Sequence, residues 1–204
     1  RHRLQRLHHL CDCHDPESVR LAERNGFHFV DIRLTFESDL SRLAPRPRLA
    51  PGVVLRPVRP GDVRALQAIA AKTYIDSRYF FDRRFSREDC ERFYANWVRK
   101  ACRGYADLVV VASRGREVVG YIIATRRTPA TASIDLVSVA PGAEGSGLGK
   151  SLVHAVQRWA LSKGASEVTV VTQGRNYAAQ RLYQAAGFKT QRLELWYHKW
   201  FDPR

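Results

Sequence analysis

A strand, a glycine-rich turn and a helix follow one another between Ala132 and Lys163, and this succession constrains the fold more than any other feature. The strand ends at Val139, and the turn from Pro141 to Gly149 leads directly into the helix. Glycines let the backbone approach a ligand closely, and the free amide groups at a helix start bind anions. The segment therefore predicts a pyrophosphate site. Its glycine spacing and its late position differ from those of dinucleotide-binding folds.

The chain from Val53 onward alternates between strands and helices. Apolar residues at helical spacing, such as Val63, Leu66 and Ile69, mark the helices. The alternation predicts a mixed sheet with helices on both faces. We expect strands at 53–58, 108–112, 117–125, 132–139, 167–172 and 190–198, helices at 60–72, 86–104 and 176–186 and from the glycine turn to 163, and an aromatic loop at 73–85.

A proline-rich stretch divides the chain. Residues 41–52 read SRLAPRPRLAPG, and three prolines without apolar periodicity predict a linker. We place the linker at 43–52, between a front piece of residues 1–42 and a back domain of residues 53–204.

The front piece aligns without gaps on the end of the back domain. Residues 15–34 fall on residues 176–195, and Gly26-Phe27 falls on Gly187-Phe188. The match predicts a partial internal repeat, as if the front piece were the tail of a second, degenerate copy. The alternative is that helix–glycine–strand junctions resemble one another, because glycine is favoured just past a helix. Ala22 stands at the position of Tyr183, so we expect the front piece to carry no catalytic group and to cover part of the main sheet.

The composition favours anionic partners. The chain carries 34 Lys and Arg against 20 Asp and Glu, a net charge of +14. A basic, arginine-rich composition also follows from the base composition of a genome, and the even spread of basic residues argues against a nucleic-acid-binding module. No apolar run approaches the roughly 20 residues of a membrane helix, and Arg1 to Leu10 has no apolar signal core. We therefore expect a cytoplasmic protein without a membrane partner, and a homodimer is left open.

The four cysteines do not form a convincing metal site. We expect Cys11, Cys13, Cys90 and Cys102 to be free thiols, because the chain is long and shows no secretory signal. Histidines flank Cys11 and Cys13, but the spacing is too short for a zinc site and no second ligand pair follows. We therefore expect no metal.

A second segment, from Asn176 to Phe188, carries a candidate proton donor. On a helix, Asn176, Ala179 and Tyr183 share one face. Tyr183 can then present its hydroxyl to the cleft that the glycine turn lines. The alternative is a core aromatic, the commoner position of a lone helical tyrosine.

Together, the two segments resemble the signature motifs of the GNAT N-acetyltransferase superfamily. The resemblance covers residues 53–198 and implies an α/β (α+β) GNAT fold with a mixed, mostly antiparallel sheet, and acetyl-CoA as cofactor. It implies that Tyr183 protonates the departing thiolate, that backbone groups near Val137 and Val139 bind the pantetheine arm, and that Asn176 contacts the cofactor. It also implies that the pyrophosphate binds amides of Glu144, Gly145, Ser146, Gly147, Leu148, Gly149 and Lys150. Glu144 departs from the motif, which has Arg or Gln there, so we expect weaker binding.

A narrower resemblance concerns the acceptor. Ser77-Arg78-Tyr79, Arg92 to Trp97 and Arg103-Gly104 are similar to the acceptor side of the dTDP-fucosamine acetyltransferases, which also carry a truncated GNAT-like front lobe. The alternative for Phe93 and Trp97 is the buried face of a helix. The resemblance implies that Ser77, Arg78 and Tyr79 bind the substrate, a nucleotide-linked amino sugar. Arg83 and Arg84 in the same loop offer further phosphate ligands, and Tyr74, Phe80 and Phe81 offer flat surfaces for a base or a sugar.

The expected reaction is direct acetyl transfer to a primary amine. A backbone N–H between Ile134 and Val139 would stabilise the oxyanion. Asp76, Tyr79, Asp135 or a water chain would be the general base, and His154 would lie at the surface or at the cofactor rim. The alternatives are a protein N-terminus or a small amine as acceptor and, outside the enzymes, a basic nucleic-acid-binding module.

Overall fold

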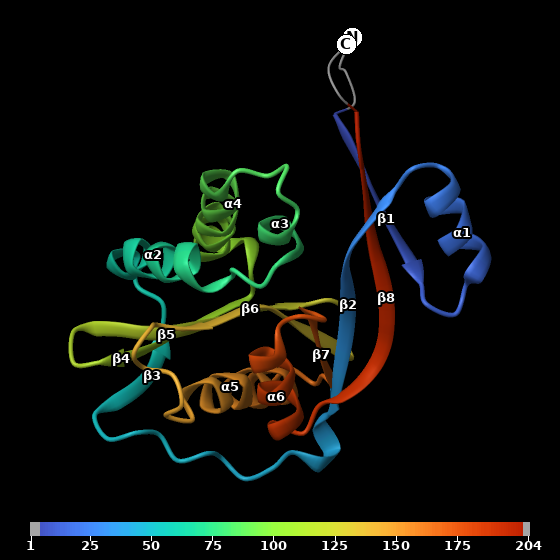
Figure 1. Ribbon diagram of the computed structural model, residues 1–204. Coiled ribbons are helices and arrows are strands. Elements are labelled where there is room, and N and C mark those ends of the chain that lie inside the picture. The colour runs from blue at the N-terminus through green and yellow to red at the C-terminus, as the bar shows by residue number, and fades with distance from the viewer. Residues whose placement is uncertain (1–4, 202–204) are drawn as a thin grey trace.

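The computed structural model describes residues 5–201 and contains one eight-stranded sheet (Figure 1). Residues 1–4 and 202–204, the ends of the predicted front piece and back domain, lie outside the described residues. The strand order is β1-β8-β2-β7-β6-β5-β4-β3. Among the described strands, β6 and β7 alone pair in parallel, which confirms the predicted mixed, mostly antiparallel sheet. The strands are β1 (Arg6–Asp12), β2 (His28–Asp39), β3 (Val53–Pro57), β4 (Leu108–Arg114), β5 (Glu117–Arg126), β6 (Thr131–Val139), β7 (Glu167–Gln173) and β8 (Lys189–Trp200).

Helices cover both faces of this sheet (Figure 1). On one face, α2 and α4 pack around Leu66, Val98 and Tyr121; on the other, α5 packs through Leu152 and Val156. Amphipathic helices bury their apolar stripe in this way. The helices are α1 (Pro16–Arg24), α2 (Val63–Thr73), α3 (Arg78–Phe81), α4 (Arg87–Lys100), α5 (Leu148–Ser162) and α6 (Tyr177–Ala185).

Two predicted segments differ from the structure by more than one or two residues at an end. The expected loop at 73–85 contains the short helix α3, and Ser77 at its start accepts hydrogen bonds from the backbone amides of Phe80 and Phe81 through its carbonyl oxygen. The helix expected to reach Gly104 is regular only to Lys100. It continues as a wider turn over 101–105, which Gly104 ends with a φ of 96°.

The front piece is part of the sheet, and the expectation that it covers the sheet is wrong. Strand β2 lies between β7 and β8 and pairs with both in antiparallel register. Phe36 on β2 is 1% exposed and belongs to the core around α5. A strand with neighbours on both edges has its backbone hydrogen bonds satisfied there, which a covering segment would not.

The front piece and the end of the chain have matching local structure. Gly26 and Gly187 end α1 and α6 with φ of 69° and 85°. The offset between the segments is 161 positions, the difference between Asn176 and Asp15. This offset moves His28 onto Lys189 and Glu37 onto His198. The pair His28↔His198 thus corresponds to the pair Lys189↔Glu37, so β2 and β8 are arranged about a local two-fold axis. The division of the chain at 43–52 stays a prediction, because one sheet joins both parts.

The proline-rich stretch lies against α5. Leu49 and Ala50 pack on the core, and His154 Nε2 lies 3.0 Å from the carbonyl oxygen of Ala44. His154 is 6% exposed, and burial lowers its pKa. The expected surface or cofactor-rim position of His154 is therefore wrong, because residues far away in the sequence cover it.

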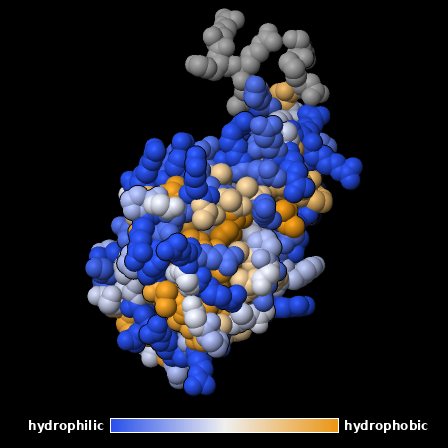
Figure 2. Space-filling view, turned by 90° about the vertical axis from the view of Figure 1, so that its left-hand side faces the viewer, coloured by the Kyte–Doolittle hydropathy of each residue, from blue (hydrophilic) through white to orange (hydrophobic). Residues whose placement is uncertain are grey.

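The surface is largely hydrophilic in the face shown in Figure 2, with apolar side chains gathered near its middle. Among residues 5–201, no helix is long and apolar enough to span a membrane.

Candidate active site

A cleft of about 1430 Å³ runs between the α2–α4 side of the molecule and the α5–α6 side. It extends from the glycine turn, past the carboxyl ends of β6 and β7, to the α2–α3 segment, and β2 and β8 contribute to one wall. Six Arg or Lys side chains line it, against three Asp or Glu. A cleft with this balance attracts anionic ligands.

The cleft opens where β6 and β7 separate. Their parallel pairing runs from Thr131↔Glu167 to Ile134↔Val170 and no further. At the same place β6 has a register shift against β5, between Ile123 and Ala124. A bulge of this kind bends a strand and re-aims its backbone. The remainder of β6, up to Val139, therefore faces the cleft in place of a neighbouring strand.

The glycine turn forms the end of the cleft where the pyrophosphate is expected to bind. Gly142, Gly145 and Gly147 have φ of 85°, 71° and 76°, and a Cβ on any of them would meet open space. No side chain caps α5, whose N-cap is Gly147. The first amide groups of α5 are thus available to an anion. Of the seven residues predicted here, all but Ser146 line the cleft; the Ser146 hydroxyl donates to the carbonyl oxygen of Ala143 at 2.7 Å.

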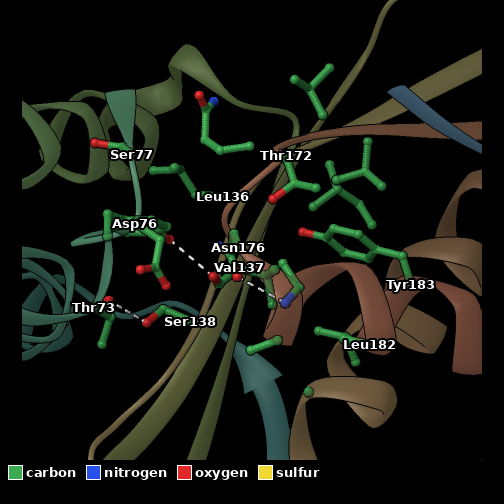
Figure 3. A pocket seen from close by; sticks show the side chains of 18 of the residues that line it. Thr73, Asp76, Ser77, Leu136, Val137, Ser138, Thr172, Asn176, Leu182 and Tyr183 are labelled. Carbon is green, nitrogen blue, oxygen red and sulfur yellow. Dashed lines mark hydrogen bonds between the residues drawn. The ribbon is translucent and has the colours of Figure 1, made fainter. Parts of the chain in front are cut away.

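Helix α6 brings Tyr183 and Asn176 to the cleft. The Tyr183 hydroxyl points toward the space between Thr172 and Val137 (Figure 3). Its side chain is buried, and desolvation raises its pKa. The ring also packs in the core, so the two interpretations of Tyr183 are compatible. Asn176 caps α6, since its Oδ1 accepts a hydrogen bond from the Ala179 amide at 2.9 Å.

Hydrogen bonds tie α2 to the open part of β6. The Tyr74 hydroxyl donates to the carbonyl oxygen of Val137 at 3.2 Å and lies 3.0 Å from the Tyr121 hydroxyl. The Ser138 hydroxyl donates to the Thr73 hydroxyl at 2.7 Å. The sequence did not predict these contacts, because each joins two residues that lie 47 to 65 positions apart. They fix the α2 end against the backbone that the cofactor is expected to meet.

The predicted acceptor residues lie at the far end of the cleft. Ser77 is buried, and the Arg78 Nη2 donates to the Tyr79 hydroxyl at 2.6 Å. The Arg78 guanidinium carbon lies 4.3 Å from the Tyr79 ring centroid and 4.1 Å from that of Trp196. Desolvation lowers the pKa of Arg78. Within the described part of the chain, Arg78 forms no salt bridge and its Nε has no hydrogen-bond partner.

Two further arginines expected here lie elsewhere. Arg83 and Arg84 line a separate pocket of about 230 Å³ beside Trp200. The chain turns away from the main cleft at the end of α3. Phe80 and Phe81, the last two residues of α3, therefore do not line this cleft either.

The candidate bases differ in their surroundings. Asp76 is exposed and lines the cleft, whereas the Tyr79 hydroxyl accepts from Arg78. Asp135 lines the cleft but bonds Thr125 and Arg127, and burial raises its pKa. Asp76 thus has the greatest freedom to meet a substrate.

The cysteine-rich turn lies outside the cleft. Possible ligand atoms of Asp12, Cys13 and His14 lie within 4.8 Å of one another, at the end of β1. None of the three lines the cleft.

The family follows from comparison with known proteins. The sequence model of the acetyltransferase (GNAT) family matches residues 68–188. The chain belongs to this family. The match confirms the resemblance that the two motifs carry. GNAT acetyltransferases use acetyl-CoA as acetyl donor.

Two relatives concern polysaccharides or amino sugars by name. The spore coat polysaccharide biosynthesis protein SpsD of Bacillus subtilis is 31% identical over 81% of this chain and 58% of its own. The dTDP-fucosamine acetyltransferase of Escherichia coli is 28% identical over 68% of this chain and 59% of its own. The chain thus spans about three fifths of these relatives.

Solved structures support the fold. A GNAT protein from Sphaerobacter thermophilus superposes with a TM-score of 0.72 at 21% identity, over 97% of this chain and 60% of that one. A tandem GNAT protein from the clavulanic acid biosynthesis pathway superposes with a TM-score of 0.69 at 18% identity, over 98% of this chain and 65% of that one.

Proposed function

We propose that this protein transfers an acetyl group from acetyl-CoA to the primary amine of a nucleotide-linked amino sugar. One observation carries the proposal: a single cleft joins an uncapped glycine turn, the Tyr183 hydroxyl and the desolvated Arg78. The first feature suits the pyrophosphate of the donor, the second suits the thiol, and the third suits an anionic acceptor.

The reaction is a direct transfer. The neutral amine attacks the thioester carbonyl carbon, the C–S bond breaks, and the amide forms. A backbone N–H of β6 beyond Ile134 stabilises the carbonyl oxygen as it gains charge. Tyr183 donates its proton to the thiolate, and burial favours the protonated form of Tyr183. Asp76, directly or through water, accepts the proton that the amine loses.

The donor site in this proposal uses mainly backbone groups. Amides from Glu144 to Lys150 hold the pyrophosphate, and Val137 and Val139 on β6 hold the pantetheine arm. Asn176 fixes the start of α6 and presents its remaining amide group to the cofactor. Because these contacts come from the backbone, Glu144 weakens the site without abolishing it.

The acceptor in this proposal meets Ser77, Arg78 and Tyr79. Guanidinium groups bind phosphate oxygens in bidentate fashion, and the Tyr79 ring gives a sugar or a base a flat surface. The relative named dTDP-fucosamine acetyltransferase supports an amino sugar. The front piece, in this view, is a remnant lobe that completes the sheet of the catalytic domain at 53–204.

The test is a screen for thiol release from acetyl-CoA. Amino sugars are offered with and without their nucleoside diphosphate, beside a peptide N-terminus and a polyamine. We expect the sugar nucleotide to give the largest kcat/KM. A larger value for the peptide or the polyamine would contradict the acceptor and leave the acetyltransferase; no thiol release with any amine would contradict the enzyme.

A further inference from the structure

The N-terminal strand β2 places a charged side chain in the acceptor half of the cleft. Arg33 on β2 pairs with Glu194 on one side and with Gln173 on the other. Arg33 and Gln173 both line the cleft. The Gln173 Oε1 is buried and has no hydrogen-bond partner in the described part of the chain. The front piece thus reaches the site that sequence analysis assigned to the back domain alone.

Arg78 approaches the same wall from α3. Its guanidinium lies over the ring of Trp196, which is two residues from Glu194 on β8 and therefore on the same sheet face. Arg33 is the diagonal neighbour of Trp196, and such neighbours lie about 7–8 Å apart. Desolvation lowers the pKa of Arg78; Tyr79, Tyr94 and Asp31 oppose this shift, and the charge of Arg33 adds to it.

The acidic residues on this wall do not neutralise both arginines. Glu194 forms a salt bridge with Arg33 and lies 3.8 Å from Arg192. Asp31 is 2% exposed and bonds the Arg175 side chain at 3.0 Å. Arg78 has no carboxylate within salt-bridge distance among residues 5–201, although the charge of Asp31 acts on it, so its positive charge is the one left unpaired on this wall. An anion between the two arginines would remove their repulsion and replace the water that Arg78 has lost.

We propose that Arg33 and Arg78 together form the binding subsite for the phosphate groups of the acceptor. The front piece then supplies a specificity-determining residue to the active site, and Glu194 is the resting counter-ion of Arg33. Two guanidinium groups suit the two phosphates of a nucleoside diphosphate. This inference rests on the proposed function for the identity of the acceptor, but the subsite can be measured without catalysis.

The experiment measures binding of thymidine diphosphate to protein saturated with CoA, so that the glycine turn is already occupied. We expect Arg33→Gln and Arg78→Gln each to weaken binding roughly tenfold or more, as for a lost charged hydrogen bond. Arg116→Gln, in the exposed β4–β5 turn, removes the same charge far from the wall and should leave binding unchanged.

The matched variants concern Glu194. Glu194→Gln frees Arg33 and should leave binding equal or tighter. Arg33→Gln leaves the buried Glu194 carboxylate with only its longer contact to Arg192 and should destabilise the fold. The double variant Arg33→Gln with Glu194→Gln should regain thermal stability and keep the tenfold loss of binding. A double variant that also regains affinity would overturn the subsite, as would a wild-type protein that does not bind the probe.

The two proposals fail separately. Loss of binding in Arg33→Gln, together with no acetylation of any sugar nucleotide, would retain the subsite and refute the acceptor. Unchanged binding, together with acetylation of the sugar nucleotide, would refute the subsite and retain the acceptor.

Discussion

The ring centroid of Phe36 lies 5.9 Å from the ring centroid of Tyr183. Phe36 belongs to β2, whereas Tyr183 belongs to α6 near the other end of the chain. Phe188 lies 5.8 Å from Tyr183 as well. The proposed proton donor is therefore held by aromatic rings from two distant parts of the sequence, and its position depends on β2.

Replacing Phe36 tests this dependence. Phe36→Ala should lower the free energy of unfolding by about 3–5 kcal/mol, because it leaves a cavity in the core. It should also lower kcat, since Tyr183 loses a packing partner. Phe29→Ala is the matched control on the same strand, where the side chain is 50% exposed and pairs with the Tyr197 ring, and it should cost about 0.5–1.5 kcal/mol. Equal losses in a denaturant titration would contradict the role of Phe36.

Removing the Tyr183 hydroxyl should affect chemistry and spare binding. Tyr183→Phe should lower kcat by about 10²–10⁴-fold, the usual worth of a general acid, with the Kd for acetyl-CoA unchanged. Tyr177→Phe, on an exposed side chain of the same helix, should keep full activity. A rate within about twofold of wild type would make Tyr183 a packing residue only.

The pKa of Tyr183 gives a second expectation. Desolvation raises this pKa, so the folded protein holds the proton to higher pH than free tyrosine does. The rate should therefore show no loss from Tyr183 ionisation below about pH 10. A wild-type alkaline limb below that pH that disappears in Tyr183→Phe would contradict the raised pKa.

A side chain at Gly147 should block the donor site. Gly147 has a φ of 76°, and a Cβ there would project into open space at the cleft. Gly147→Val should abolish thermal stabilisation by acetyl-CoA. Gly115→Val is the matched control, because Gly115 has a φ of 58°, also meets open space and lies in the β4–β5 turn. Both variants should lose comparable intrinsic stability, and only Gly115→Val should still be stabilised by acetyl-CoA.

The charge of Glu144 should oppose donor binding. Glu144 is exposed and lines the cleft beside the glycine turn. Glu144→Gln should tighten acetyl-CoA binding by about 0.2–1 kcal/mol, the usual worth of an exposed charge pair. The gain should shrink as salt is added. Equal Kd values at low salt would show that the carboxylate points away from the pyrophosphate.

Local patterns predicted much of the fold and which segments line the glycine-turn end of the cleft. The passage from β6 through the glycine turn into α5, and the face shared by Asn176 and Tyr183, follow from spacings of a few residues. Such signals are complete within one segment. The glycine turn and α6 meet in one cleft because α5 and α6 pack on the same sheet face.

The remainder depends on contacts between distant segments. Nothing within residues 28–39 indicates that β2 enters the sheet between β7 and β8, because the pairing depends on strands more than 100 residues away. The burial of His154 likewise depends on the distant proline-rich stretch that covers it. The place of Arg33 depends on the strand register that pairs it with Glu194. The alignment of the front piece with the chain end indicated a strand at this place, but it did not show which strands β2 would pair with.

A hydrogen bond between His198 and Asp82 joins β8 to the end of α3. His198 Nδ1 lies 2.7 Å from Asp82 Oδ2, which also accepts from Trp200 Nε1 at 2.9 Å. His198 is 1% exposed, and desolvation lowers its pKa although Asp82 opposes the shift. For Asp82, burial acts to raise the pKa, but hydrogen bonds from His198 and Trp200 leave it lowered.

These shifts predict a loss of stability toward acid. The pKa of His198 is lower in the folded protein than in the unfolded chain, so below about pH 6.5 the unfolded chain binds more protons and the free energy of unfolding falls. Asp82 adds its loss only below about pH 4, where the unfolded carboxyl titrates.

His198→Asn keeps an amide donor for Asp82 and does not titrate. Denaturant titrations between about pH 7.5 and pH 5 should therefore show a smaller fall for His198→Asn than for wild type. His154 and His8, whose pKa values are also lowered, continue to contribute in both proteins, and His8 stacks on His198. Equal falls would show that protonated His198 is as well accommodated in the folded protein as in the unfolded chain.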